Sequence, residues 1–184
     1  MKQVFNYINI LSIDVVAGAM LSSAFACRVV GVEPGFVYWI IFATAVWVVY
    51  SADHLVDAVR LKNQAHTIRH AFHHHHFKLL SILVIVTAVI SISLAILFAN
   101  PHILLLGSAT GIGVLLYLLL VHKSGGGHNL FLQKELMVSL IYVIGVWGGP
   151  MVLSDHAINP GQWLAAIVFL LLAFANVLYF TIFD

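Results

Sequence analysis

The residues most able to do chemistry gather in one stretch, Ser51–Lys78, which reads SADHLVDAVRLKNQAHTIRHAFHHHHFK. It holds two of the 7 acidic residues, four of the 8 Lys and Arg, and seven of the 11 His. On a helix, Asp53 and Asp57 share one face about one turn apart, with Arg60 following on the same face. Two carboxylates so placed can hold a divalent cation, and a neighbouring arginine can hold an anion that the cation bridges, such as a diphosphate. We therefore predict that Asp53 and Asp57 are metal ligands.

An anionic substrate at this site would be attracted by lysine and arginine, because most imidazoles are neutral at pH 7. Lys134 and Glu135 lie at the entrance of the fifth apolar run, and both are expected to point toward the same cytoplasmic surface. The alternative for the whole stretch is a solvated turn between two membrane helices, where charged side chains stay hydrated at little cost in free energy. The predicted substrate-binding residues are Arg60, Lys62, Arg69 and Lys134.

The histidines form a separate pattern downstream of the acidic pair. Four of them recur at the spacing of one helical face: His66, His70, His73 and His74. Such a face could bind a transition metal, contact lipid phosphates or be solvated. His75 and His76 are expected to be solvated loop residues.

Composition decides the kind of protein that positions these residues. Hydrophobic residues make up 62% of the 184 residues and charged residues only 8%. A soluble domain has about a quarter of its residues charged, so this chain is an integral membrane protein whose surroundings include membrane lipids. A net charge of +1 gives no case for a nucleic-acid partner, and a single cysteine excludes an internal disulfide.

Six apolar runs are long enough to span a bilayer, and each must be helical because an isolated strand cannot satisfy its backbone hydrogen bonds in lipid. The predicted fold is therefore all-α: a polytopic membrane helix bundle of about six transmembrane helices in a single domain, 1–184. Turn-forming sequences such as Glu33-Pro34-Gly35 and Asn159-Pro160-Gly161 separate the runs. The predicted spans are 8–27, 36–52, 79–99, 103–121, 136–153 and 163–183.

Orientation follows from the basic residues. If six helices alternate across the bilayer, seven of the 8 Lys and Arg fall on one side and only Arg28 on the other. Basic residues favour the cytoplasmic side. Both termini and the polar loop 53–78 are therefore predicted to be cytoplasmic, in a bacterial inner membrane.

Two features inside the apolar runs stand out. Asp14 lies in the first run, where an ionisable group normally faces the bundle interior or a wet cavity; a structural bond to a neighbouring helix and a functional role are both open. Glycines at 107 and 111 form a smooth strip on the fourth run, which predicts close helix packing. Gly148, Gly149 and Pro150 are expected to kink or unwind the end of the fifth run, or to serve packing.

Three segments, YSADHLVDAVR, RHAFHHHH and KELMVSLIYVIGVWGGP, resemble a divergent branch of the UbiA superfamily of intramembrane prenyltransferases. In that family an acidic motif, N-x-x-x-D-x-x-x-D, lies at the cytoplasmic end of the second helix. Mg²⁺ held between it and a second acidic motif binds an isoprenyl diphosphate. The resemblance matches Asp53 and Asp57 to the two aspartates of the first motif, and Val49 stands where the family has asparagine.

The resemblance also implies more chain than is present. The family usually has eight or nine helices, and its second acidic motif would begin at Asp184, which the resemblance makes a further Mg²⁺ ligand. A C-terminal part or a partner is expected to complete the site. The implied function is binding of an isoprenyl diphosphate or related lipid through Mg²⁺ and, in an active enzyme, transfer of the prenyl group.

Two other functions fit the same residues. Six short-looped helices with little mass outside the membrane fit a non-catalytic accessory subunit of a larger membrane complex, with loop 53–78 as its docking face. The spacings His66-x-x-x-His70 and His70-x-x-His73-His74 are similar to the histidine boxes of di-iron lipid oxygenases.

Overall fold

The computed structural model describes residues 8–61, 72, 75–123 and 128–183. In these residues the regular structure is helical throughout, and six helices are long and apolar enough to cross a membrane. The predicted all-α polytopic membrane bundle is therefore confirmed. The helices are α2 Ile13–Val30, α3 Phe36–Leu61, α5 Phe77–Phe98, α6 Pro101–Lys123, α7 His128–Val152 and α8 Pro160–Phe183.

Local sequence explains where several helices begin and end. At the start of α8 the Asn159 Oδ1 accepts from the backbone N–H of Gln162 at 3.0 Å, while the Gln162 Oε1 accepts from the Asn159 N–H at 2.9 Å. This reciprocal pair is a capping box, and Pro160 suits the first helical position because that position needs no N–H donor. At the end of α2, Gly31 adopts φ 83°, which lets its N–H close the helix on the Cys27 carbonyl at 2.8 Å.

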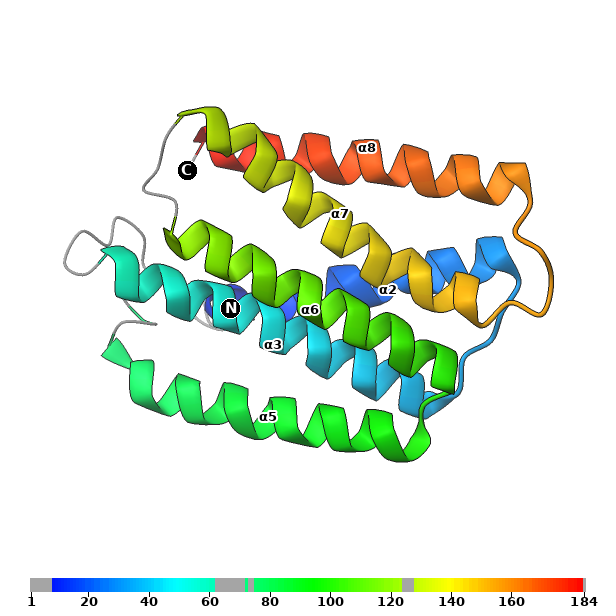
Figure 1. Cartoon of the computed structure of the whole chain (residues 1–184), viewed down its shortest axis with the longest axis horizontal. Coiled ribbons are helices and arrows are strands. Elements are labelled where there is room, and N and C mark those ends of the chain that lie inside the picture. The colour runs from blue at the N-terminus through cyan, green and yellow to red at the C-terminus, as the bar shows by residue number, and fades with distance from the viewer. Residues whose placement is uncertain (1–7, 62–71, 73–74, 124–127, 184) are drawn as a thin grey trace. The chain divides into compact units, whose positions relative to one another are not determined.

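The chain divides into two compact units, and α2 contributes its first half to one and its second half to the other. The first unit contains the described residues up to Leu21 with α3 and α5, which lie side by side (Figure 1). Its core is Leu55, Leu80 and Val84. A polar clip joins the two helices farther along, where the Thr44 hydroxyl lies 3.0 Å from the Ser91 hydroxyl.

The second unit contains the second half of α2 with α6, α7 and α8, and α7 packs against both α6 and α8 (Figure 1). Trp147 of α7 is 1% exposed and meets Phe25 edge-on and Phe169 at a tilt, with ring centroids 6.2 Å and 6.1 Å away. The Tyr142 hydroxyl donates to the Ser22 hydroxyl at 3.3 Å. Aromatic packing therefore ties three helices together in this unit.

Close helix approach occurs at a different glycine from the predicted pair. A Cβ built on Gly148 of α7 would lie 2.9 Å from the Leu106 Cδ2 of α6, so a side chain there would have to displace the end of the Leu106 side chain. In the part of the chain that the structure describes, Cβ atoms at Gly107 and Gly111 would meet nothing within 4 Å, so no helix of the second unit packs closely on that strip. The helix α7 continues through Pro150 to Val152, so its end is not unwound before that point.

The first two spans differ from their predicted bounds. Instead of one run over 8–27, residues 8–10 are helical, the chain breaks at Leu11 and Ser12, and α2 begins at Ile13. The second span does not end at 52, because α3 remains helical to Leu61. The acidic pair therefore belongs to a helix.

Candidate functional site

The candidate site begins at the end of α3 that carries Asp53. No proline or glycine interrupts the sequence from Tyr38 to Leu61, so the helix continues past its apolar part, which ends at Asp53, its first charged residue. With a rise of ~1.5 Å per residue, Asp53 and Asp57 lie about 6 Å apart along the axis and on one face. Asp53 is half-buried. The predicted helical placement of the two residues is confirmed for the backbone.

The basic residues are placed in part. Arg60 lies in the last turn of α3, one turn beyond Asp57, and Lys134 lies in α7 of the second unit. The side chains of Asp57, Arg60 and Lys134 are outside the described part of the chain. The structure describes neither the backbone nor the side chains of three further predicted residues, Lys62, Arg69 and Asp184. The same holds for four of the histidines: His66, His70, His73 and His74.

The donor chemistry of the α3 pair suits Mg²⁺. This ion is commonly held by one or two carboxylates together with substrate phosphates, and it needs no cage built wholly from protein. Among the side chains that the structure describes, no group of three or more His, Cys, Asp or Glu comes together as a metal site.

His76 is not a simple solvated loop residue. It stands directly before α5, and its ring stacks on Phe72 with centroids 4.4 Å apart. The His76 Nδ1 lies 3.2 Å from the Phe72 carbonyl oxygen and donates to it in the tautomer that carries the proton there. Phe72 in turn packs on the core of the first unit. His75 is exposed, as expected, so the two neighbours differ in role.

Glu135 is buried, although the sequence predicted that it points toward the polar surface. It is 4% exposed, and the fully buried Ser139 one turn later donates its hydroxyl to the Glu135 carbonyl at 2.8 Å. The prediction is wrong because Glu135 faces the packed side of α7 rather than the open one. The sequence did carry a signal, since Glu135, Ser139 and Tyr142 fall at i, i+4 and i+7, the spacing of one helical face.

Asp14 has a setting that the sequence did not predict. Its carboxylate is exposed, and its Oδ2 accepts a hydrogen bond from the Asn9 Nδ2 at 2.9 Å. The partner therefore belongs to the same segment and not to a neighbouring helix. Between them lies Ser12, a buried non-glycine residue at φ 57°. The Trp47 indole of α3 donates to the Leu11 carbonyl at 3.1 Å and satisfies a group that the break leaves outside the helix.

Comparison with known proteins identifies no relative. No protein-family model, no curated protein and no solved structure matches the chain. The resemblance to the UbiA superfamily therefore rests on the motifs of the sequence.

Proposed function

We propose that this integral membrane protein binds an isoprenyl diphosphate, or a related lipid diphosphate, through Mg²⁺ at the end of α3 that carries Asp53 and Asp57. The observation that supports it most is the unbroken course of α3 to Leu61. Asp53 is the first charged residue of α3 and Asp57 follows one turn later, so both lie where the apolar sequence of the helix ends. An isoprenyl diphosphate needs this arrangement, since its chain partitions into lipid while its diphosphate stays at the polar edge.

Each residue has a role in this proposal. Asp53 and Asp57 supply carboxylate oxygens to Mg²⁺, and Arg60, one turn later, binds diphosphate oxygens. Lys62, Arg69 and Lys134 add positive charge, and Asp184 is proposed as a further ligand. Bound Mg²⁺ would neutralise charge that develops on a departing diphosphate, which is the chemistry that a prenyl transfer requires.

The location of the site follows the charge distribution. Seven of the 8 lysines and arginines fall on the side of loop 53–78 when six helices alternate. We therefore propose that this loop faces the cytoplasm of a bacterial cell and that the protein resides in the inner membrane.

Binding of labelled farnesyl diphosphate to the purified protein, with and without Mg²⁺, tests the proposal. Asp53→Asn and Asp57→Asn should each weaken Mg²⁺-dependent binding about 10–100-fold, because each removes one of two anionic ligands. Arg60→Ala should weaken diphosphate binding and spare Mg²⁺ binding. Asp155→Asn is the matched control, since Asp155 is an exposed acid in the connection between α7 and α8, and it should bind normally.

The same experiment separates the alternatives. Equal binding by the wild type and both α3 variants would contradict the proposal and favour the accessory subunit. Iron in the purified protein that is lost in His73→Ala and His74→Ala would favour the oxygenase instead.

A further inference from the structure

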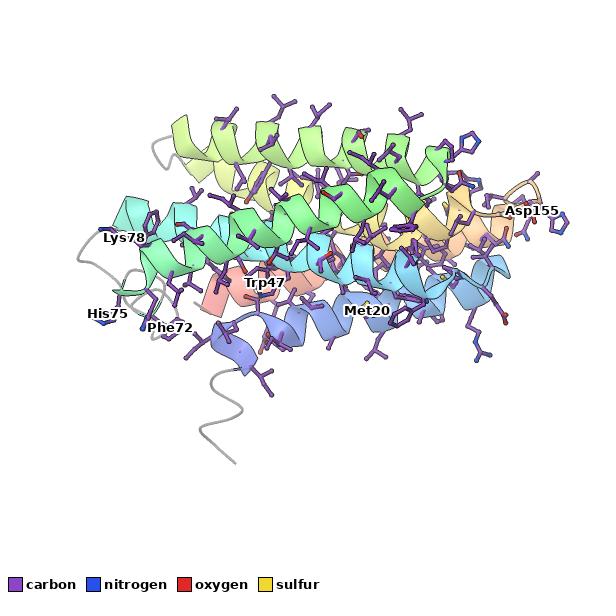
Figure 2. The ribbon with its side chains drawn as sticks, turned by 90° about the horizontal axis from the view of Figure 1, so that it is seen from below. Met20, Trp47, Phe72, His75, Lys78 and Asp155 are labelled. Atoms are coloured by element: carbon purple, nitrogen blue, oxygen red, sulfur yellow. The ribbon has the colours of Figure 1, made fainter. Side chains whose placement is uncertain are left out.

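The carboxylate of Asp14 lies within the apolar layer and not at its edge. The break before α2 is fixed by the Trp47 bond to the Leu11 carbonyl. From Trp47 to Asp53, the first charged residue of α3, the helix rises about 9 Å. Figure 2 accordingly shows Trp47 well inside the first unit, between Met20 and the group of Phe72, His75 and Lys78 at its end. Asp14 follows the break, one turn deeper.

This carboxylate is incompletely satisfied. In the described part of the chain, its only hydrogen bond is the one from the neutral Asn9 amide. Arg28 on the same helix is about 21 Å away along the axis, and Lys78 lies at the end of the unit (Figure 2). A charged side chain inside the apolar layer is costly and is normally paired, and the position of Asp14 in the first turn of α2 offsets only part of that cost through the helix dipole.

The helix face around Asp14 is shaped for a close neighbour. Asp14, Ala17, Gly18 and Leu21 fall at i, i+3, i+4 and i+7, and all four are exposed. A Cβ built on Gly18 would meet nothing within 4 Å, and Leu21 is 73% exposed. Small residues let helix backbones approach closely in lipid, where hydrogen bonds between helices supply much of the attraction. We call these four residues the Asp14 face.

We propose that the Asp14 face is the docking surface for a transmembrane helix of another protein that carries an arginine or lysine at the depth of Asp14. Charge complementarity decides the kind of partner. The recess at Ala17 and Gly18 lets the partner's backbone approach, and its basic group then reaches the carboxylate oxygen that Asn9 leaves open. A second copy of this chain fits poorly, because two copies side by side in the same orientation would bring Asp14 against Asp14.

The test uses the full chain, labelled with a fluorescent donor, in phosphatidylcholine vesicles. The probe is an acceptor-labelled spanning peptide of leucine and alanine with one arginine at the depth of Asp14; matched peptides carry glutamine or leucine there. Energy transfer should show the arginine peptide associating about tenfold more tightly than the leucine peptide, the usual scale of a polar contact between membrane helices. Asp14→Asn, which is nearly isosteric, should remove that preference.

A second variant keeps the test valid should Asp14→Asn fail to fold. Gly18→Leu retains the carboxylate but fills the recess, so it should also weaken association of the arginine peptide. Gly111→Leu is the matched control, because it makes the same change at an exposed position of α6. Equal association of the three peptides, or an arginine preference that survives Asp14→Asn, overturns the proposal. Self-association of the chain that is lost in Asp14→Asn would assign the face to a second copy and overturn it as well.

Discussion

At the scale of single residues, the break in the first span leaves backbone groups without their helical hydrogen-bond partners, and side chains must replace those partners. Two of the groups involved are Leu11, whose carbonyl accepts from Trp47, and Ser12, which is held at φ 57°. Neither is recognisable in the sequence, because Leu11 and Ser12 sit in an apolar run that looks like any other spanning helix. Left-handed backbone at serine is rare, and only the neighbouring packing imposes it.

Replacing Trp47 with phenylalanine isolates that hydrogen bond. The substitution keeps an aromatic ring against the core of the first unit but leaves the Leu11 carbonyl without its donor. The free energy of unfolding should fall by about 1–3 kcal/mol, the cost of an unsatisfied polar group away from water. Denaturant unfolding in detergent, followed by circular dichroism, measures it.

Trp163→Phe serves as the control for Trp47→Phe. Trp163 is exposed and its indole makes no hydrogen bond in the described part of the chain, so loss of the indole should change stability little. Equal effects of the two substitutions would show that the indole of Trp47 does not hold the break.

At the scale of helices, the Leu106 side chain of α6 occupies space that a side chain at Gly148 of α7 would need. Gly148→Val should lower the free energy of unfolding by about 1–3 kcal/mol, because the added carbons must displace the Leu106 side chain. Gly111→Val makes the same chemical change where no atom lies within 4 Å, and helix propensity then leaves stability nearly unchanged or slightly improved. Thermal melts of both variants in the same detergent measure the difference in stability. Equal losses of stability would contradict the packing of Leu106 against Gly148.

Helix positions were largely predictable, whereas helix neighbours were not. Apolar run length and the Glu-Pro-Gly and Asn-Pro-Gly turn sequences located the spans, because a single segment in lipid can satisfy its backbone hydrogen bonds only as a helix. The strip of Gly107 and Gly111 looked like a contact surface, but a pair of glycines shows only that another helix could approach closely and not that one does. The burial of Glu135 was missed because an acid near a helix end suggests solvent until its spacing with Ser139 is noticed.

The acidic pair shows the same limit at the candidate site. That Asp53 and Asp57 share a helix face follows from their spacing alone, and the helix to Leu61 bears it out. The sequence does not specify which other side chains meet them, because that depends on segments far apart in the chain. Their role as Mg²⁺ ligands stays a prediction.

At the scale of the whole molecule, six crossings place the connections alternately on opposite sides of the membrane. In a Cys27→Ala background, a cysteine at His75 should react with an impermeant maleimide only from the side that we propose to be cytoplasmic. A cysteine at Asp155 should react only from the other side. Both native side chains are exposed, so neither needs the protein to open. Labelling of both from one side would contradict the six-span topology.

The indoles of Trp47 and Trp147 can serve as intrinsic fluorescence probes. Trp47 belongs to the first unit and Trp147 to the second. In the described part of the chain the Trp147 Nε1 has no hydrogen-bond acceptor, so its emission should lie at short wavelength and move to the red as water reaches it. Variants that keep only one of these tryptophans would follow each unit by itself. Coincident transitions would mean one cooperative domain, and separate transitions would mean two halves of the chain that melt independently.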